Sequence, residues 1–295
     1  MTLIAVTIAG SDSSGGAGIQ ADLKTFSALG VYGASVITAL TAQNTVGVQG
    51  VHDVPPDFIA KQIDSVFSDL VVNAVKIGML SCAEAVETVA EGLDRYEQEQ
   101  VVLDPVMIAK SGDPLLAEEA VEALRTLLLP RALIITPNLP EAARLLETAI
   151  AEDEEEMAEQ AAALIDLGPR AVLLKGGHGE GPESVDIFHD GVDPVRLAAK
   201  RIETPNTHGT GCTLSSAIAA GLAHGFDLLH AVAHAKAYLS EAIAQADALL
   251  VGSGHGPVHH FHAVWGKVPM FGIVPSGEDD EPRGTVHRLK PREDE

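Results

Sequence analysis

The chain has 295 residues, of which 46% are hydrophobic and only 4% aromatic, and its formal net charge is −23. This length is ample for one large α/β domain with a dry core. A surface this acidic repels nucleic-acid phosphates and anionic lipids, so we expect no nucleic acid and no membrane among its partners. The charge serves either solubility or adaptation to a salty cytosol, where screening removes self-repulsion.

Signals for export or membrane insertion are missing from the sequence. No apolar run approaches the ~20 residues that a membrane helix needs. Residues 1–6 lack the basic lead of a signal peptide and are typical of a first strand. Two cysteines, Cys82 and Cys212, need not be bridged in a chain of this size. We therefore predict a cytoplasmic protein with free thiols.

In the first third of the chain, short apolar runs alternate with helical periodicity. The predicted strands are 3–9, 32–39 and 74–77, and the predicted helices are 18–29, 57–70 and 82–96. In helix 57–70 the apolar stripe is formed by Phe58, Ile59, Ile63, Val66 and Phe67. This rhythm is typical of strands that are each followed by a helix packing back on the sheet.

The same alternation continues through the rest of the chain. The predicted strands are 101–103, 133–135 and 171–174, with helices at 118–128, 139–146 and 154–167. Residues 184–189 and 195–199 indicate a hairpin around Asp190-Gly191, a strong turn signal. Two helices, 213–224 and 228–249, close the pattern. From about residue 266 it stops, so we predict one domain over 1–265 and an acidic, loosely ordered tail over 266–295.

This order of elements predicts an α/β fold with three layers, in which helices cover both faces of a mostly parallel sheet. Ligands of such sheets bind beyond the carboxyl ends of the strands. Polar residues follow most of the predicted strands, and these are the first candidates for a site. They are Gly10-Ser11-Asp12, Thr41-Ala42-Gln43-Asn44, Gly78-Met79, Asp104-Pro105-Val106-Met107, Thr136-Pro137-Asn138 and Lys175-Gly176-Gly177.

The strongest single motif is Gly209-Thr210-Gly211-Cys212, directly before a predicted helix. Glycines let the backbone turn its N–H groups inward, and a helix start adds free N–H groups and a positive dipole end. The loop is therefore suited to a phosphate oxygen or to a transferring phosphoryl group. An ordinary glycine loop before a helix is the alternative. A P-loop is excluded because no Gly-Lys-Ser/Thr follows.

Cys212 ends this loop at the predicted helix start, where a thiol pKa falls below ~8.5. The functional interpretation is a base, or a polar guide, for a substrate hydroxyl. The alternative is a small buried residue, because buried cysteines are usually inert. Its position beside the glycines favours the functional interpretation.

A second glycine-rich turn, Asp12-Ser13-Ser14-Gly15-Gly16-Ala17-Gly18, joins the first strand to the first helix. Small residues there let a ligand approach the backbone closely, either a nucleotide phosphate or a flat ring. A flexible loop is the alternative. Asp22, one turn into the helix, could face the same cleft.

Charged residues at the later strand ends indicate a nucleotide–metal site. The carboxylates of Asp104 and Glu141, together with Asn138, suit Mg²⁺, directly or through water. Lys175 also ends an apolar strand, where a cation could meet a phosphate. Each of them alone is more often a helix cap or a surface charge, but their shared sheet edge favours function. His259, His260 and His262 lack a completing ligand, so we expect structural or subunit contacts instead of a metal.

Read together, these segments resemble the bifunctional hydroxymethylpyrimidine/phosphomethylpyrimidine kinases of thiamine synthesis, in the ribokinase-like superfamily. The similarity runs from about residue 7 to residue 265. Its main matched segments are Gly15-Gly16-Ala17-Gly18-Ile19-Gln20-Ala21-Asp22, Ala42-Gln43-Asn44-Thr45, Lys76-Ile77-Gly78-Met79-Leu80, Lys110-Ser111-Gly112, Pro137-Asn138-Leu139-Pro140-Glu141, Lys175-Gly176-Gly177-His178 and Asn206-Thr207-His208-Gly209-Thr210-Gly211-Cys212.

The resemblance implies a ribokinase-like three-layer fold, ATP and Mg²⁺ as cofactors, and a homodimer. It implies phosphorylation of 4-amino-5-hydroxymethyl-2-methylpyrimidine to its monophosphate, and of that to the diphosphate. The implied site residues fall into four groups: catalytic Cys212 with the anion hole Gly209, Thr210 and Gly211; substrate-binding Gln43, Gly10, Asp22, Met79 and Val106; ATP-binding Lys175, Asn138 and Thr207; and metal-binding Asp104 and Glu141.

Two other functions stay open at this point. Pyridoxal kinase would use the same fold and another flat hydroxymethyl heterocycle, although Met79 and Gln43-Asn44 resemble the pyrimidine enzyme more closely. A non-catalytic binder on this fold would have lost its metal and loop residues. Asp104, Glu141 and Cys212 are all present, which favours an enzyme.

Overall fold

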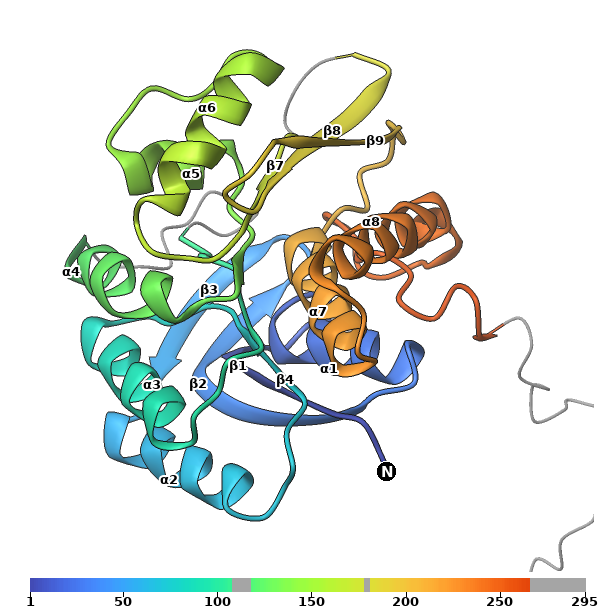
Figure 1. Cartoon of the computed structure of the whole chain (residues 1–295). Helices are drawn as coiled ribbons and strands as arrows, with labels where there is room; N and C mark the ends of the chain where they lie inside the picture. Colours follow the sequence, from blue (N-terminus) through green and yellow to red (C-terminus); the bar gives the residue numbers. More distant parts are fainter. Residues whose placement is uncertain (108–117, 178–180, 266–295) are drawn as a thin grey trace, which may run out of the picture.

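In the computed structural model, residues 1–107, 118–177 and 181–265 are described, and they form a single nine-stranded sheet in the order β3-β2-β1-β4-β5-β6-β7-β8-β9. The six inner strands, from β2 to β7, run parallel, whereas β3, β8 and β9 join at the edges in antiparallel pairing. The predicted mostly parallel α/β fold is confirmed (Figure 1).

The inner strands β4 to β7 have only two to four residues each, whereas β1 and β2 have nine and thirteen. The strands are β1 Ile4–Asp12, β2 Tyr32–Asn44, β3 Gly47–Asp53, β4 Ala74–Ile77, β5 Val101–Leu103, β6 Ile134–Ile135, β7 Val172–Lys175, β8 Glu183–His189 and β9 Val195–Lys200. The α-helices are α1 Gly18–Ala28, α2 Pro56–Phe67, α3 Ala83–Arg95, α4 Glu118–Ala123, α5 Leu139–Leu146, α6 Glu154–Ile165, α7 Thr210–Ala223 and α8 Leu228–Ala244. Shorter helical turns are Leu124–Leu128, Leu129–Arg131 and Ala246–Ala248.

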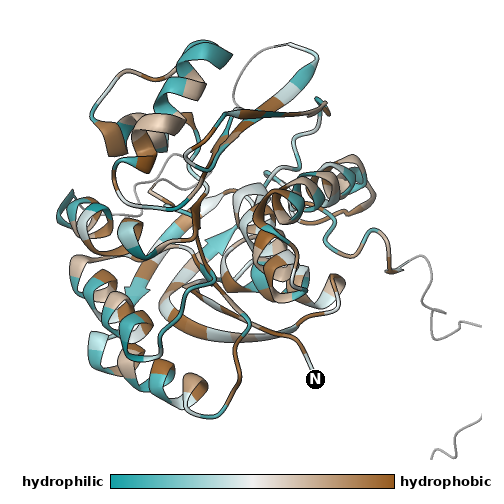
Figure 2. Ribbon diagram, viewed as in Figure 1, coloured by the Kyte–Doolittle hydropathy of each residue, from teal (hydrophilic) through white to brown (hydrophobic). Residues whose placement is uncertain are grey.

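Helices cover the sheet on both faces and enclose two hydrophobic cores. Helices α2 to α6 pack on one face and α1, α7 and α8 on the other (Figure 1). Adjacent strand residues serve opposite cores: Val101 and Leu103 belong to the first, and Val102 between them to the second. This is why the inner strands are mostly apolar on both faces, while the helices carry both brown and teal stretches in Figure 2.

The structure differs from the sequence-based prediction in three elements near the site. Strand β2 extends to Asn44 and pairs with an edge strand, Gly47–Asp53, that was not predicted. The predicted helix 118–128 is α-helical only to Ala123, and a π-helical turn follows. Helix α7 begins at Thr210 instead of residue 213, so the glycine motif forms its N-cap and first turn.

Two further predictions have separate outcomes. The hairpin is confirmed, because β8 and β9 pair across residues 190–194. The predicted tail, 266–295, lies outside the described residues, and the division into domain and tail stays a prediction. Among the described residues, no helix is long and apolar enough to cross a membrane.

Candidate active site

A cavity of about 560 Å³ opens at the carboxyl ends of the parallel strands. Its walls include residues from the ends of β1, β2, β5 and β7 and from the N-terminal turn of α7. Parallel strands place all these ends at one edge of the sheet, as the sequence analysis expected. Thirteen of the fourteen predicted site residues line this one cavity, and only Asp22 does not. The thirteen are Gly10, Gln43, Met79, Asp104, Val106, Asn138, Glu141, Lys175, Thr207, the loop 209–211 and Cys212.

One end of the cavity is formed by the start of α7. Gly209 is the N-cap residue with φ 80°, a left-handed conformation that favours glycine. A Cβ there would also stand 2.0 Å from the carbonyl oxygen of Gly16. The N–H groups of Gly211 and Cys212 lie in the first turn, where a helix offers them no acceptor. This end therefore presents free donors and a positive dipole to the cavity.

Beside this turn lies an ion pair between Lys175 and Asp104. Lys175 Nζ is 2.9 Å from Asp104 Oδ1, and the Thr136 hydroxyl donates to the same oxygen at 3.0 Å. Asp104 is only 2% exposed. Burial would lower the pKa of Lys175, but the carboxylates of Asp104 and Glu141 outweigh it and raise that pKa. Lys175 is therefore a fixed cation at the cavity wall.

Glu141 and Asn138 form a capping box at the start of α5. The Asn138 side chain accepts from the Glu141 N–H at 2.9 Å, and the Glu141 carboxylate accepts from the Asn138 N–H at 2.8 Å. Burial raises the pKa of Glu141 to about 7, partly offset by Lys175. Both residues are thus helix caps and also line the cavity, so the two interpretations of the sequence are compatible.

The expectation of an acidic thiol at Cys212 is wrong. Burial raises the pKa of Cys212 to about 11, and the nearby carboxylates of Asp22 and Asp104 add to the effect, although Lys76 opposes them. Cys212 therefore lines the cavity as a neutral thiol.

Asp22 lies behind the cavity wall and does not line it. It is fully buried, and four hydrogen bonds from three donor groups saturate its carboxylate: Lys76 Nζ at 2.9 Å from each oxygen, the Thr7 hydroxyl at 2.6 Å and the Ser216 hydroxyl at 2.7 Å. Direct contact with a ligand in the cavity is therefore not supported for Asp22. Its partner Lys76 does line the cavity, and the sequence analysis did not single it out.

Other cavity residues were also not selected from the sequence. Asp186 on β8 and Lys236 on α8 form a second buried ion pair in the wall, 2.7 Å apart, and Asp186 also accepts the Gly176 N–H at 3.0 Å. A charged residue inside an apolar strand, as Lys76 is in β4, is a sequence signal that could have found such pairs.

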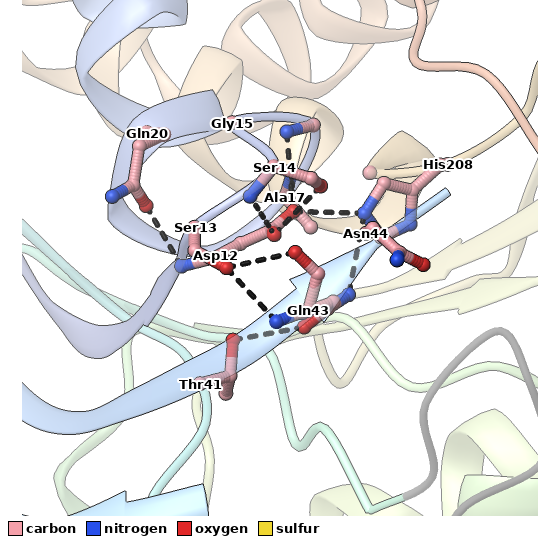
Figure 3. Close-up of polar contacts among 12 residues, drawn as sticks. Asp12, Ser13, Ser14, Gly15, Ala17, Gln20, Thr41, Gln43, Asn44 and His208 are labelled. Carbon is pink, nitrogen blue, oxygen red and sulfur yellow. Dashed lines mark hydrogen bonds and ion pairs between the residues drawn. The ribbon is translucent and has the colours of Figure 1, made fainter. Parts of the chain in front are cut away.

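The glycine-rich turn after β1 is organised by Asp12 (Figure 3). Its carboxylate accepts the backbone N–H groups of Ser14, Gly16 and Ala17 at 2.8 to 3.1 Å. His208 Nε2 lies 2.9 Å from Asp12 Oδ2. Burial would raise the pKa of Asp12, but these hydrogen bonds, first that of His208, hold it well below its usual range. This turn is therefore ordered around a carboxylate and is not a loose loop.

The C-terminal segment 252–262 packs against the loop after β2 and the start of α7. The Gly254 and His255 N–H groups donate to the hydroxyl and carbonyl oxygens of Thr45, at 3.1 and 2.8 Å. His260 is buried, and its Nε2 lies 3.1 Å from the Thr213 hydroxyl. Burial, reinforced by the charge of Lys24, lowers the pKa of His260 to about 3, so it is a neutral structural contact. Among the described residues no cluster of three or more ligating side chains could hold a metal ion.

Comparison with known proteins agrees with this geometry. The sequence model of the phosphomethylpyrimidine kinase family matches residues 12–259. The chain is 63% identical to hydroxymethylpyrimidine/phosphomethylpyrimidine kinase of Rhizobium meliloti over 265 residues, covering 90% of this chain and 99% of that protein. It is 59% identical to the Escherichia coli protein of the same name over 261 residues, covering 88% and 98%.

Solved structures show the same relationship. Phosphomethylpyrimidine kinase of Clostridium difficile 630 is 48% identical with a TM-score of 0.73, covering 82% of this chain and 100% of that one. Pyridoxal kinase of Bacillus subtilis, solved as an ADP complex, is 36% identical with a TM-score of 0.82, covering 89% and 99%. The fold is thus ribokinase-like, that of a small-molecule kinase.

The chain belongs to the phosphomethylpyrimidine kinase family, as its motifs predicted. The relatives with 59–63% identity carry that name, whereas the pyridoxal kinase is 36% identical, which favours the pyrimidine kinase over the alternative.

Proposed function

We propose that this protein uses ATP to phosphorylate 4-amino-5-hydroxymethyl-2-methylpyrimidine, and then phosphorylates the monophosphate to the diphosphate. The observation that carries the proposal is one cavity lined by a helix N-terminus, a fixed cation and a carboxamide. The helix N-terminus and the cation suit a transferring phosphoryl group, and the carboxamide suits a ring with a hydrogen-bonding edge.

The Gln43 carboxamide is the proposed reader of the pyrimidine. It lies on β2 at the cavity wall, and Gly10, Met79 and Val106 line the same cavity. An added Cβ at Gly10 would lie 3.1 Å from the Met79 sulfur, so the absence of a side chain at Gly10 leaves room for the Met79 side chain.

At the phosphate end, Lys175 and the first-turn N–H groups of α7 would bind the phosphates of ATP, together with Asn138 and Thr207. Mg²⁺ prefers one or two carboxylates plus phosphate oxygens and water. Asp104 and Glu141 provide that donor set, and a cation beside Glu141 would favour its ionised form despite burial. Bound there, the ion would neutralise phosphate charge.

The residues of this chain then act by positioning and charge stabilisation. The N–H groups of Gly211 and Cys212 would stabilise the charge that the transferring phosphoryl group gains. Cys212, as a neutral thiol, would accept a hydrogen bond from the substrate hydroxyl and orient its oxygen for attack. Lys175 would hold the phosphate in line with that oxygen.

One experiment tests the proposal. The purified protein is incubated with ATP, Mg²⁺ and the aminopyrimidine alcohol, and the mono- and diphosphate are followed by mass spectrometry, with pyridoxal in a parallel reaction. We expect both pyrimidine products in sequence. Phosphorylation of pyridoxal alone would contradict the proposal and favour the pyridoxal kinase alternative.

A cytoplasmic location and a homodimer complete the proposal. The location is supported by the two cysteines, which are free in the structure. The homodimer is implied by the family resemblance, and sedimentation analysis of the purified protein would test it.

A further inference from the structure

His208 connects the two loops that meet over the cavity. It directly precedes the N-cap Gly209, and its Nε2 atom faces Asp12 Oδ2 at 2.9 Å and Gln43 Nε2 at 3.4 Å (Figure 3). The ring packs so closely on the glycine-rich turn that an added Cβ at Gly16 would lie 2.3 Å from its Cδ2 atom. His208 is 8% exposed, and so its ring is held in this position.

Proton counting decides which group donates at this contact. Asp12 is ionised, because its carboxylate accepts several N–H groups and its pKa is held low. An ionised carboxylate only accepts, so at 2.9 Å His208 Nε2 must carry a hydrogen. A ring nitrogen that donates to Asp12 cannot also accept from the Gln43 amide nitrogen.

The same count applies at the other end of the Gln43 carboxamide. The Thr41 hydroxyl has one hydrogen, and both the Ser11 carbonyl, at 3.0 Å, and the Gln43 Oε1 position, at 3.1 Å, lie within reach of it. If Thr41 donates to Ser11, it can accept from an amide nitrogen. With the Gln43 nitrogen toward Thr41 and its oxygen toward His208, the reverse of the orientation in Figure 3, every contact pairs a donor with an acceptor. Thr41 then donates to Ser11 and accepts from Gln43, and the His208 hydrogen, given mainly to Asp12, is shared with the Gln43 oxygen.

We propose that the Asp12–His208 pair is a positioning device that fixes the orientation of the Gln43 carboxamide and thereby selects a ring with an amino group beside a ring nitrogen. In this orientation Gln43 keeps one free acceptor on the His208 side and one free donor on the Thr41 side. The acceptor takes the amino group, and the donor takes the neighbouring ring nitrogen.

The consequence for the proposed substrate, on which this inference rests, is its direction in the cavity. In 4-amino-5-hydroxymethyl-2-methylpyrimidine the hydroxymethyl group is next to the amino group. An amino group held on the His208 side turns the hydroxymethyl toward Gly209 and Cys212. A 4-oxo ring presents the inverse pattern, an N–H beside a carbonyl, and would bind with its hydroxymethyl turned away from the anion hole.

The test compares three substitutions of His208. His208→Leu removes the N–H, His208→Asn carries an amide too short to reach Asp12 and Gln43, and His208→Gln can place an amide N–H near the ring Nε2 position. Values of kcat/KM are measured for the 4-amino and 4-oxo alcohols, with the KM for ATP and the melting temperature as checks. His234→Leu, an exposed residue that does not line the cavity, is the matched control.

We expect His208→Leu and His208→Asn to lower the preference for the amino ring over the oxo ring by about tenfold or more, because the carboxamide is free to reverse. His208→Gln should restore most of that preference, and His234→Leu should leave it unchanged. A merely structural role would lower kcat/KM for both rings by the same factor, and that result would overturn the inference.

A double-mutant cycle with Gln43→Ala adds a second criterion. Without the carboxamide, His208→Leu should change kcat/KM for the amino ring by less than about twofold. Additive losses would mean that His208 acts independently of Gln43, against the inference. A wild-type enzyme that is inactive on the amino alcohol would instead overturn the proposed function, and this inference with it.

Discussion

Two buried aspartate–lysine pairs lie near Cys212, and they differ in how fully they are satisfied. In the Asp22–Lys76 pair both side chains are 0% exposed, and the Thr7 and Ser216 hydroxyls complete the bonding of the carboxylate. In the Asp104–Lys175 pair the lysine is 15% exposed at the cavity. Within the described part of the chain, hydrogen bonds from Thr136 and Lys175 both reach Asp104 Oδ1.

The difference distinguishes a pair that only stabilises the fold, Asp22–Lys76, from a pair that can also bind a ligand, Asp104–Lys175. A saturated carboxylate has no lone pair to offer, so Asp22 can only hold β1, β4, α1 and α7 together. Asp104 keeps Oδ2 beside Gly211, 3.3 Å from where a Cβ of that residue would stand. Charge alone does not identify a site. The number of unfilled hydrogen-bond positions does.

The largest effect should come from breaking the saturated pair. Asp22→Asn leaves the Lys76 charge buried without a counterion, and we expect a loss of about 3–5 kcal/mol in the free energy of unfolding. Urea denaturation would measure it. The double variant Asp22→Asn/Lys76→Met removes both charges and should recover most of the loss. A cost below about 1 kcal/mol for the single variant would show that the pair is not structural.

Asp104→Asn should act on turnover more than on stability. The Lys175 side chain is 15% exposed at the cavity, so the protein should tolerate the loss of the counterion better than at Asp22. We expect kcat to fall about 100-fold or more, because charge that stabilises the transferring phosphate is lost. Steady-state kinetics at saturating ATP and Mg²⁺ would test this, and near-normal turnover would place the metal elsewhere.

Cys212 lies close enough to both aspartate–lysine pairs for their charges to act on its pKa. The pH dependence of kcat therefore tests how the two pairs affect this thiol. Its thiol pKa is raised to about 11, so the neutral form prevails throughout pH 6–9. We therefore expect no tenfold rise of kcat per pH unit over that range. Cys212→Ala should lose about tenfold in kcat, and Cys212→Ser less, because a hydroxyl can still orient the substrate. A unit slope present in the wild type and absent in Cys212→Ser would identify the thiolate as the base.

The smallest effect should come from adding a methyl group at Gly211, next to the Asp104–Lys175 pair. Gly211→Ala would bring a Cβ to 3.3 Å from Asp104 Oδ2 and 3.4 Å from Lys175 Nζ, while alanine favours the helix. We expect kcat/KM for ATP to fall about threefold to tenfold with no loss of melting temperature. In the same helix, Gly221→Ala would meet Ala231 at 3.0 Å and should lower the melting temperature instead. Equal behaviour of the two variants would contradict the comparison.

Much of this site follows from the sequence because parallel topology brings strand ends together. Asp104, Asn138 and Lys175 each follow or end an apolar strand, and their meeting in one cavity needed no knowledge of side-chain packing. Strand β3 could not be predicted in the same way. Its residues are almost all exposed, so it lacks the alternation of buried and exposed side chains that marks a strand.

Pairings across long stretches of chain were also beyond sequence reasoning. Asp22 and Lys76 are 54 residues apart, and Asp12 and His208 are 196 apart. Their contacts depend on how α1 and the turn before α7 pack on the sheet. The pKa of Cys212 was mispredicted for a related reason, since a helix start is a local feature and desolvation is a property of the whole fold.

The closing segment 252–262 has a consequence for the order of events during synthesis. This segment is hydrogen-bonded to Thr45, a residue from the first part of the chain. His260 contacts the N-terminal turn of α7 through the Thr213 hydroxyl. A nascent chain that ends before residue 254 lacks all of these contacts, and one that ends before residue 260 still lacks that of His260, although every proposed catalytic residue is already present. The enzyme should therefore become active only after nearly all of its folded part has left the ribosome, and it must fold through contacts of high sequence separation.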